Sequence, residues 1–97
     1  MQETGIELIT KERDEHFTKH AINVGMDVLH NNEHQLAFAA EKLCVPILDV
    51  PSFFPPENWS EELWDKMTSK TYKQRLIIAG SLIVAEIDRL NAIKDNE

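Results

Sequence analysis

The sequence predicts an all-α fold: a single bundle-like domain over residues 1–97, built from four helices with a long C-terminal helix at its centre. Three observations lead to this prediction. A proline-free stretch that is apolar on nearly every face runs from Thr71 to Asp95, helix-capping signals precede the shorter segments, and all four prolines lie between Pro46 and Trp59. A chain of 97 residues has room for one modest core and not for two.

The C-terminal stretch is the element around which the others are expected to pack. At about 100° per residue, one continuous apolar arc forms along it. The arc consists of Leu76, Ala79, Leu82, Ile83, Ile87, Leu90 and Ile93, and Ile77, Ile78 and Val84 widen it. We therefore expect neighbours on more than one side. Such wide apolar coverage on a small chain also predicts a homo-oligomer, in which part of this helix is buried between subunits.

The first helix is predicted from Gly5 to His20, because Thr4 and Glu7 have the spacing of a capping box. Its apolar face is interrupted by three side chains that a core would not normally contain: Arg13, His16 and His20.

The middle of the chain is expected to hold two shorter helices. After a connecting loop over 21–31, Asn32 can cap a second helix with Gln35 in the reciprocal position, and Pro46 ends that helix. The proline-rich segment over 46–59 contains Phe53 and Phe54, which favours an ordered apolar loop lying over the core. Ser60 then caps a third helix that ends near Ser69.

Composition excludes several classes of function. The net charge of -7 argues against a broad nucleic-acid-binding surface, although a small anionic ligand needs only a local positive pocket. No apolar run is long enough to span a membrane, and there is no leader-like segment, so we expect a cytoplasmic protein, in the host cytoplasm if a phage encodes it. The single cysteine, Cys44, excludes an internal disulfide and is expected to be a small buried side chain.

Charges within the apolar arc mark the first candidate site. Arg75 and Glu86 project in nearly the same direction from the last helix, with Tyr72 on the same side, and a charge in an apolar stripe needs a partner or a ligand. One interpretation is a buried ion-pair network with the first helix, for instance Glu86 with Arg13. The other is that these groups line a polar cavity between helices.

The first helix offers a second candidate. His16 and His20 have the spacing of a metal-binding pair, but no third ligand converges on them. A phosphate cradle formed by Arg13, His16 and Arg75 is an alternative, because arginine presents a planar fork of donors. Packing or a protein interface would explain the same side chains without a ligand.

The aromatic residues allow two interpretations. Phe53, Phe54, Trp59, Trp64 and Tyr72 can all be core residues, as is usual in a small domain. Alternatively, one or two of the tryptophans stack on a base, with the proline-rich loop as a lid. The sequence has no phosphate-binding loop, serine-hydrolase elbow, paired CxxC or dinucleotide fingerprint.

Three stretches resemble a group of small helical proteins from bacteriophages and prophages. They are GIELITKER near the start, PPENWSEELWDKM in the middle and YKQRLIIAGSLIVAEIDRL near the end, and the resemblance as a whole covers about two thirds of the chain. Members share an opening like GIELIxKER, a loop with paired tryptophans and a closing AGxLIxAEIDRL.

A looser similarity connects the chain to the all-α MazG-like nucleoside triphosphate pyrophosphohydrolases. That resemblance implies magnesium held by ExxE and ExxD carboxylates on facing helices. Glu12 and Glu15 have the ExxE spacing, and Glu86 would be the third ligand. The matching ExxD is missing, because Glu86 and Asp88 lie two residues apart and point about 160° away from each other.

Two hypotheses of function follow, with a third beside them. The first is a non-enzymatic phage-derived protein that sequesters a nucleotide-like signalling ligand at a subunit interface and so counters bacterial antiviral defence, with no cofactor. Its ligand-binding residues would be Arg13, His16, His20, Trp59, Trp64, Tyr72, Arg75 and Glu86. The second is a magnesium-dependent MazG-like hydrolase that uses Glu12, Glu15 and Glu86. The third is a module that binds a host protein through an apolar surface.

Overall fold

All secondary structure in the described part of the chain is helical. The computed structural model describes residues 2–20, 34–46, 55–56 and 59–94, except for the side chains of 16–20 and 94. Its helices are α1 (Gly5–His20), α3 (Gln35–Leu43), α4 (Glu61–Thr68) and α5 (Tyr72–Lys94). The predicted all-α class is confirmed. The predicted loops over 21–31 and around Phe53 and Phe54 lie outside the described residues.

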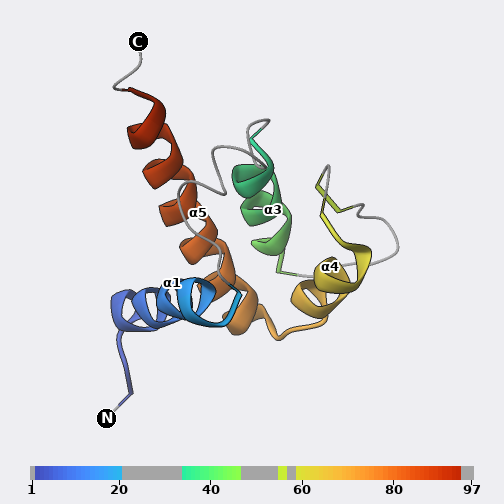
Figure 1. Cartoon of the computed structure of the whole chain (residues 1–97). Coiled ribbons are helices and arrows are strands. Elements are labelled where there is room, and N and C mark those ends of the chain that lie inside the picture. The colour runs from blue at the N-terminus through green and yellow to red at the C-terminus, as the bar shows by residue number, and fades with distance from the viewer. Residues whose placement is uncertain (1, 21–33, 47–54, 57–58, 95–97) are drawn as a thin grey trace.

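The long helix α5 is the centre of the arrangement, as the sequence predicts. Helix α3 has the most extensive contact with α5, α1 the second, and α4 a small one. Figure 1 shows α3 beside α5 and α1 crossing the first half of α5. This crossing occurs at Gly80, where a Cβ atom would lie only 2.5 Å from Cδ1 of Ile9.

Local side-chain caps start three of the helices. The Thr4 backbone N–H donates to Glu7 Oε1 over 3.1 Å, and the Glu7 N–H donates to Thr4 Oγ1 over 3.2 Å, which confirms the capping box. Before α4, Ser60 Oγ accepts from the Leu63 N–H over 3.2 Å, as predicted. Before α5, the Thr71 N–H donates to Gln74 Oε1 and the Gln74 N–H donates to Thr71 Oγ1, both over 3.2 Å.

Helix α3 begins later than the sequence predicts. Its N-cap residue is His34, with no side-chain cap, so the prediction that Asn32 is the N-cap is wrong. The reason is the backbone of His34, whose φ of 66° lies in the left-handed region and prevents the helix from extending toward Asn32. At the other end of α3, Cys44 is the C-cap residue and is exposed, so its predicted burial is also wrong.

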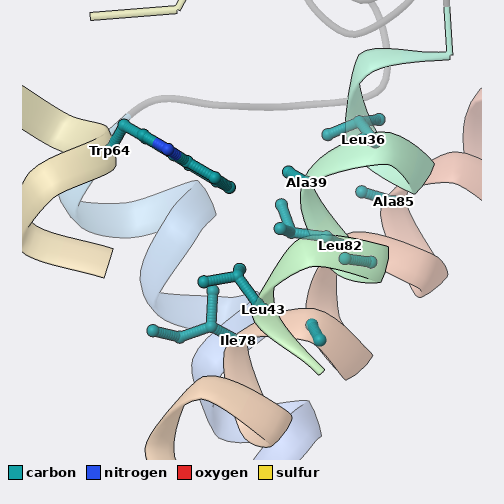
Figure 2. Packing of buried hydrophobic residues seen from close by; sticks show 9 residues of the cluster. Leu36, Ala39, Leu43, Trp64, Ile78, Leu82 and Ala85 are labelled. Atoms are coloured by element: carbon teal, nitrogen blue, oxygen red, sulfur yellow. The ribbon is translucent and has the colours of Figure 1, made fainter. Parts of the chain in front are cut away.

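The core lies between α3 and α5 and is closed by α4. Its members are Leu36, Ala39, Ala40, Leu43, Trp64, Ile78, Ala79, Leu82 and Ala85. Alanines on both α3 and α5 let the two backbones approach closely, while the leucines fill the space on either side. Figure 2 shows Trp64 reaching from α4 with its ring directed toward α3.

Away from the core, one face of α5 is only partly covered by the described part of the chain. Leu76 is 38% exposed, Ile83 47%, Ile87 52% and Leu90 43%. We call these four residues the outward stripe. The predicted arc is therefore buried only in part, because α3 has 9 residues against 23 in α5, and α1 crosses α5 rather than running along it.

Candidate functional site

A buried ion pair with an exposed histidine lies where α3 begins beside α5. Arg89 Nε donates to Glu86 Oε1 over 2.6 Å, and Arg89 Nη2 donates to Glu86 Oε2 over 3.1 Å. The two residues are 3% and 7% exposed. This two-pronged geometry is the strong form of a guanidinium–carboxylate pair. With His34, these residues form what we call the polar cluster.

His34 connects the polar cluster to solvent. Its Nδ1 lies 3.3 Å from Glu86 Oε2 and 3.4 Å from Arg89 Nη2, while 71% of its side chain is exposed. The left-handed backbone of His34 is costly for a residue with a Cβ atom, by about 1 kcal/mol. The contacts with Glu86 and Arg89 help to hold this conformation. Because Nδ1 faces the ion pair, Nε2 is the ring nitrogen available to another group.

The electrostatics of the polar cluster keep its carboxyl group ionised. The hydrogen bonds from Arg89 lower the pKa of Glu86 from its ordinary value, and burial opposes this effect. The hydrogen bond with His34 and the positive charge of Arg89 lower the pKa of Glu86 further. Glu86 is therefore a carboxylate at neutral pH, and its charge is balanced by Arg89.

Arg75 lies at the other end of α3 and binds backbone carbonyl groups. Its Nη1 donates to Leu43 O over 3.0 Å and to Val45 O over 2.6 Å, and its Nη2 donates to Pro46 O over 3.3 Å. Its Nε donates to Lys70 O over 3.2 Å. The guanidinium thus satisfies the carbonyls that α3 leaves free at its carboxyl end and ties them to the start of α5.

Arg13 pairs with a different carboxylate from the one named in the ion-pair hypothesis. Its Nη2 lies 3.5 Å from Asp88 Oδ2, with the Arg13 side chain 7% exposed and that of Asp88 39% exposed. Glu86 pairs with Arg89 and His34 instead. The cause is direction, because Asp88 projects toward the side of α5 that α1 crosses, whereas Glu86 projects toward α3.

The structure separates two residues that one interpretation of the sequence placed in a shared cavity. Arg75 and Glu86 lie at opposite ends of α3, one at its final carbonyls and one beside its N-cap residue. Tyr72 stays with Arg75, whose guanidinium carbon lies 5.6 Å from the ring centroid, and is 43% exposed. The side chains of His16 and His20 lie outside the described residues.

The two tryptophans form an edge-to-face pair. The ring centroids of Trp59 and Trp64 are 6.2 Å apart and the ring planes meet at 77°. Trp64 is 1% exposed and belongs to the core, while Trp59 is partly buried against it. This is the packing role that the sequence analysis weighed against base stacking.

Sequence reasoning did not single out His34 or Arg89. A signal existed for Arg89, which follows Glu86 by three residues and so lies within reach on the same helical face. None existed for His34, which is 52 residues away from Glu86 and meets it only through the packing of α3 on α5.

Two kinds of site are absent from the described residues. They contain no group of three or more His, Cys, Asp or Glu side chains arranged to hold a metal ion. They also include no helix of the length and apolarity needed to cross a membrane.

Comparison with known proteins gives no match to a protein-family model, to a curated protein or to a solved structure.

The polar cluster borders the outward stripe. Glu86 follows Ile83 by three residues and precedes Leu90 by four, so its side chain leaves α5 next to both of theirs. Any molecule that covers the outward stripe would therefore lie beside Glu86 and the exposed ring of His34. The arrangement provides a polar anchor at the edge of an apolar surface.

Proposed function

We propose that this protein is a non-enzymatic, homo-oligomeric binding protein that holds a small nucleotide-like ligand between its subunits, beside the polar cluster. One observation carries the proposal: the exposed stripe on α5 that could meet another subunit is bordered by His34, Glu86 and Arg89. Ligand sites in helical assemblies form where a few polar groups meet an otherwise apolar surface.

The chemistry of the polar cluster suits a ligand with both amino and phosphate groups. The Glu86 carboxylate can accept hydrogen bonds from the amino groups of a base. Because the Nδ1–H of His34 donates to Glu86, Nε2 can donate to a phosphate oxygen when the ring carries both protons. Because Arg89 balances the charge of Glu86, the carboxylate repels an anion less than an isolated one would. The resemblance to phage proteins suggests that the ligand is a signalling nucleotide and that holding it counters an antiviral response.

The first test is native mass spectrometry of the protein purified from a cell extract, followed by isothermal titration with a panel of cyclic and linear nucleotides. We expect an oligomer that retains a mass of nucleotide size and binds at least one member of the panel. If the wild-type protein bound none of them, the proposed function would be wrong.

A matched pair of variants locates the site. His34→Gly removes the imidazole and keeps the left-handed backbone without strain, so we expect it to weaken binding about tenfold, equivalent to roughly 1.4 kcal/mol. Lys66→Ala, on the exposed surface of α4, is the control and should bind as the wild type does. Equal affinities of the two variants would place the ligand elsewhere.

A second candidate is favoured by the same exposed stripe, which could instead receive a host protein. That alternative predicts a monomer in isolation, so the mass measurement separates it from the first candidate. The MazG-like alternative would need Glu12 and Glu15 to act with Glu86, and Glu86 is engaged by Arg89 and His34.

A further inference from the structure

The buried carboxylate of Glu86 is satisfied without His34. The Arg89 guanidinium already binds both of its oxygens, over 2.6 and 3.1 Å. The His34 side chain is 71% exposed, so its contact with Glu86 adds little to the stability of the fold, while its left-handed backbone costs about 1 kcal/mol. Strained residues of this kind cluster at functional sites. The ion pair is therefore better explained as a support for the histidine than the histidine as a support for the ion pair.

The ion pair also fixes which nitrogen of the neutral His34 ring carries the proton. Because Glu86 is ionised, it can only accept hydrogen bonds, so its 3.3 Å contact with Nδ1 requires a proton on Nδ1. Arg89 Nη2 lies 3.4 Å from Nδ1, but it donates to Glu86 Oε2 over 3.1 Å. The lone pair of Nε2 is then free. A carboxylate bound to one ring nitrogen makes the other nitrogen a stronger electron-pair donor.

An imidazole in this state can bind a metal ion, act as a general base or accept a phosphoryl group. A metal ion would need further ligands, and the part of the chain that the structure describes has no group of three or more His, Cys, Asp or Glu side chains suited to one. A general base acts on a substrate that the protein itself holds within hydrogen-bond reach. A phosphoryl acceptor needs only an exposed nucleophile, because the donor molecule brings the reacting group.

The start of α3 suits the negative charge that a phosphoryl group would add. His34 is the N-cap residue, its side chain makes no capping hydrogen bond, and the first turn of α3 contains no acidic residue. The first turns of α1 and α4 do contain acidic residues. Because the N-terminus of a helix carries partial positive charge, an anion beside it is stabilised. A phosphoryl group on His34 would add at α3 the charge that glutamates supply at α1 and α4.

We propose that His34 is a phosphoryl-acceptor site, modified at Nε2 by a small donor such as an acyl phosphate or a phosphoramidate. The Nε2 lone pair attacks phosphorus and forms the N–P bond, while the bond from phosphorus to the leaving group breaks and its electron pair departs with that group. The ring is positively charged until Nδ1 loses its proton to solvent. Glu86 is a positioning residue that stabilises this charge, and Arg89 holds Glu86 in place. The inference goes beyond the proposed function and does not depend on it.

The first test uses phosphoramidate, whose leaving group is ammonia, with N-acetylhistidine in the same solution as the reference. Mass spectrometry at neutral pH measures the rate at His34. We expect this rate to be about tenfold higher than that of N-acetylhistidine, the usual size of the effect of a carboxylate behind a histidine. Phosphorus NMR should show phosphorylation of His34 at Nε2 alone. A rate at or below the reference, or a product at Nδ1, would overturn the assignment.

A second test separates the charge of Glu86 from its hydrogen bond. Glu86→Gln keeps an acceptor for the Nδ1–H but removes the negative charge, so the rate at His34 should fall about tenfold. Glu62→Gln, on the exposed surface of α4, is the control and should react as the wild type does. Circular dichroism establishes that the proteins compared are folded, and the wild-type test needs no variant. Equal rates in the wild type and folded Glu86→Gln would refute the role of Glu86. A failed nucleotide titration would refute the proposed function alone.

Discussion

The two long faces of α5 are both rich in apolar residues, but they differ in side-chain size and in what covers them. The face toward α3 has Ala79, Leu82 and Ala85 at 1–4% exposure, and its two arginines are held by fixed partners. The outward stripe has only large side chains, each more than a third exposed. Small residues mark where two helices of this chain pack closely, while the large ones are left partly exposed by the described part of the chain.

Adjacent residues on α5 give the largest expected contrast between these faces. Leu82→Ala should lower the free energy of unfolding by about 3 kcal/mol, because it leaves a cavity between α3 and α5. Ile83→Ala should lower it by less than about 0.5 kcal/mol in dilute protein, because Ile83 is already 47% exposed. Urea unfolding of both variants measures the difference.

The same pair also tests the proposed contact between copies. At high protein concentration, Ile83→Ala should become more destabilising relative to the wild type, since association stabilises the folded state by mass action. Leu82→Ala should show no comparable increase. Equal losses from the two substitutions at every concentration would mean that the faces do not differ as described.

Between the two faces of α5, Glu86 forms a buried ion pair with Arg89. Glu86→Gln should cost roughly 2–3 kcal/mol near pH 7, because it leaves the guanidinium of Arg89 buried without its carboxylate. Glu62→Gln, whose side chain is 84% exposed, is the matched control and should change little.

Acid should remove the stabilisation that the Glu86–Arg89 pair gives to the fold. The direction of this pH dependence follows from the pKa of Glu86. Folding lowers the pKa of Glu86 below its unfolded value of about 4.3. The pair therefore stabilises the fold above that value, and the contribution disappears as the pH falls through the folded pKa. The difference in the free energy of unfolding between the wild type and Glu86→Gln should have its full size at pH 6 and should become smaller below about pH 4. A constant difference down to pH 2 would contradict the assignment. The pKa of Glu7 is lowered as well, by hydrogen bonds from Thr4. Because Glu7 is present in both proteins, its effect cancels in the difference between them.

At the carboxyl end of α3, the shape of the Arg75 guanidinium is expected to matter more for the stability of the fold than its charge does. Arg75→Lys keeps the positive charge but loses the planar fork that reaches Leu43, Val45 and Pro46, so it should cost about 2 kcal/mol. The exposed Lys73→Ala should stay within about 0.5 kcal/mol of the wild type. Thermal unfolding distinguishes them, and a neutral Arg75→Lys would show that charge alone is sufficient.

Features that depend on neighbouring residues could be predicted from the sequence. The capping box of Thr4 and Glu7, the Ser60 cap and the length of α5 follow from local spacing and are confirmed. The start of α3 could not be predicted, since His34 adopts its left-handed backbone beside Glu86, 52 residues away in the sequence.

The candidate site was predictable only in part. Periodicity shows that Arg75 and Glu86 point in one direction. It does not show that the two side chains contact opposite ends of the short helix α3. Periodicity likewise identifies Ile83 and Ile87 as apolar surface without showing whether the same chain covers them. Both features depend on which helix packs where, which a single sequence does not encode locally.

The smallest expected effect concerns the edge of the outward face, where α1 crosses α5. Gly80→Ala adds a Cβ atom that would lie 2.5 Å from Cδ1 and 2.8 Å from Cγ1 of Ile9, so the Ile9 side chain must move, alone or together with α1. We expect a net loss of about 1 kcal/mol, because the overpacking exceeds the gain from replacing glycine inside a helix. In an Ile9→Ala background the clash is gone, and the same substitution should stabilise the protein by about 1 kcal/mol. The change of sign, measured by urea unfolding of all four proteins, would establish that α1 limits the outward stripe at Gly80. The same effect in both backgrounds would mean that Ile9 does not pack there.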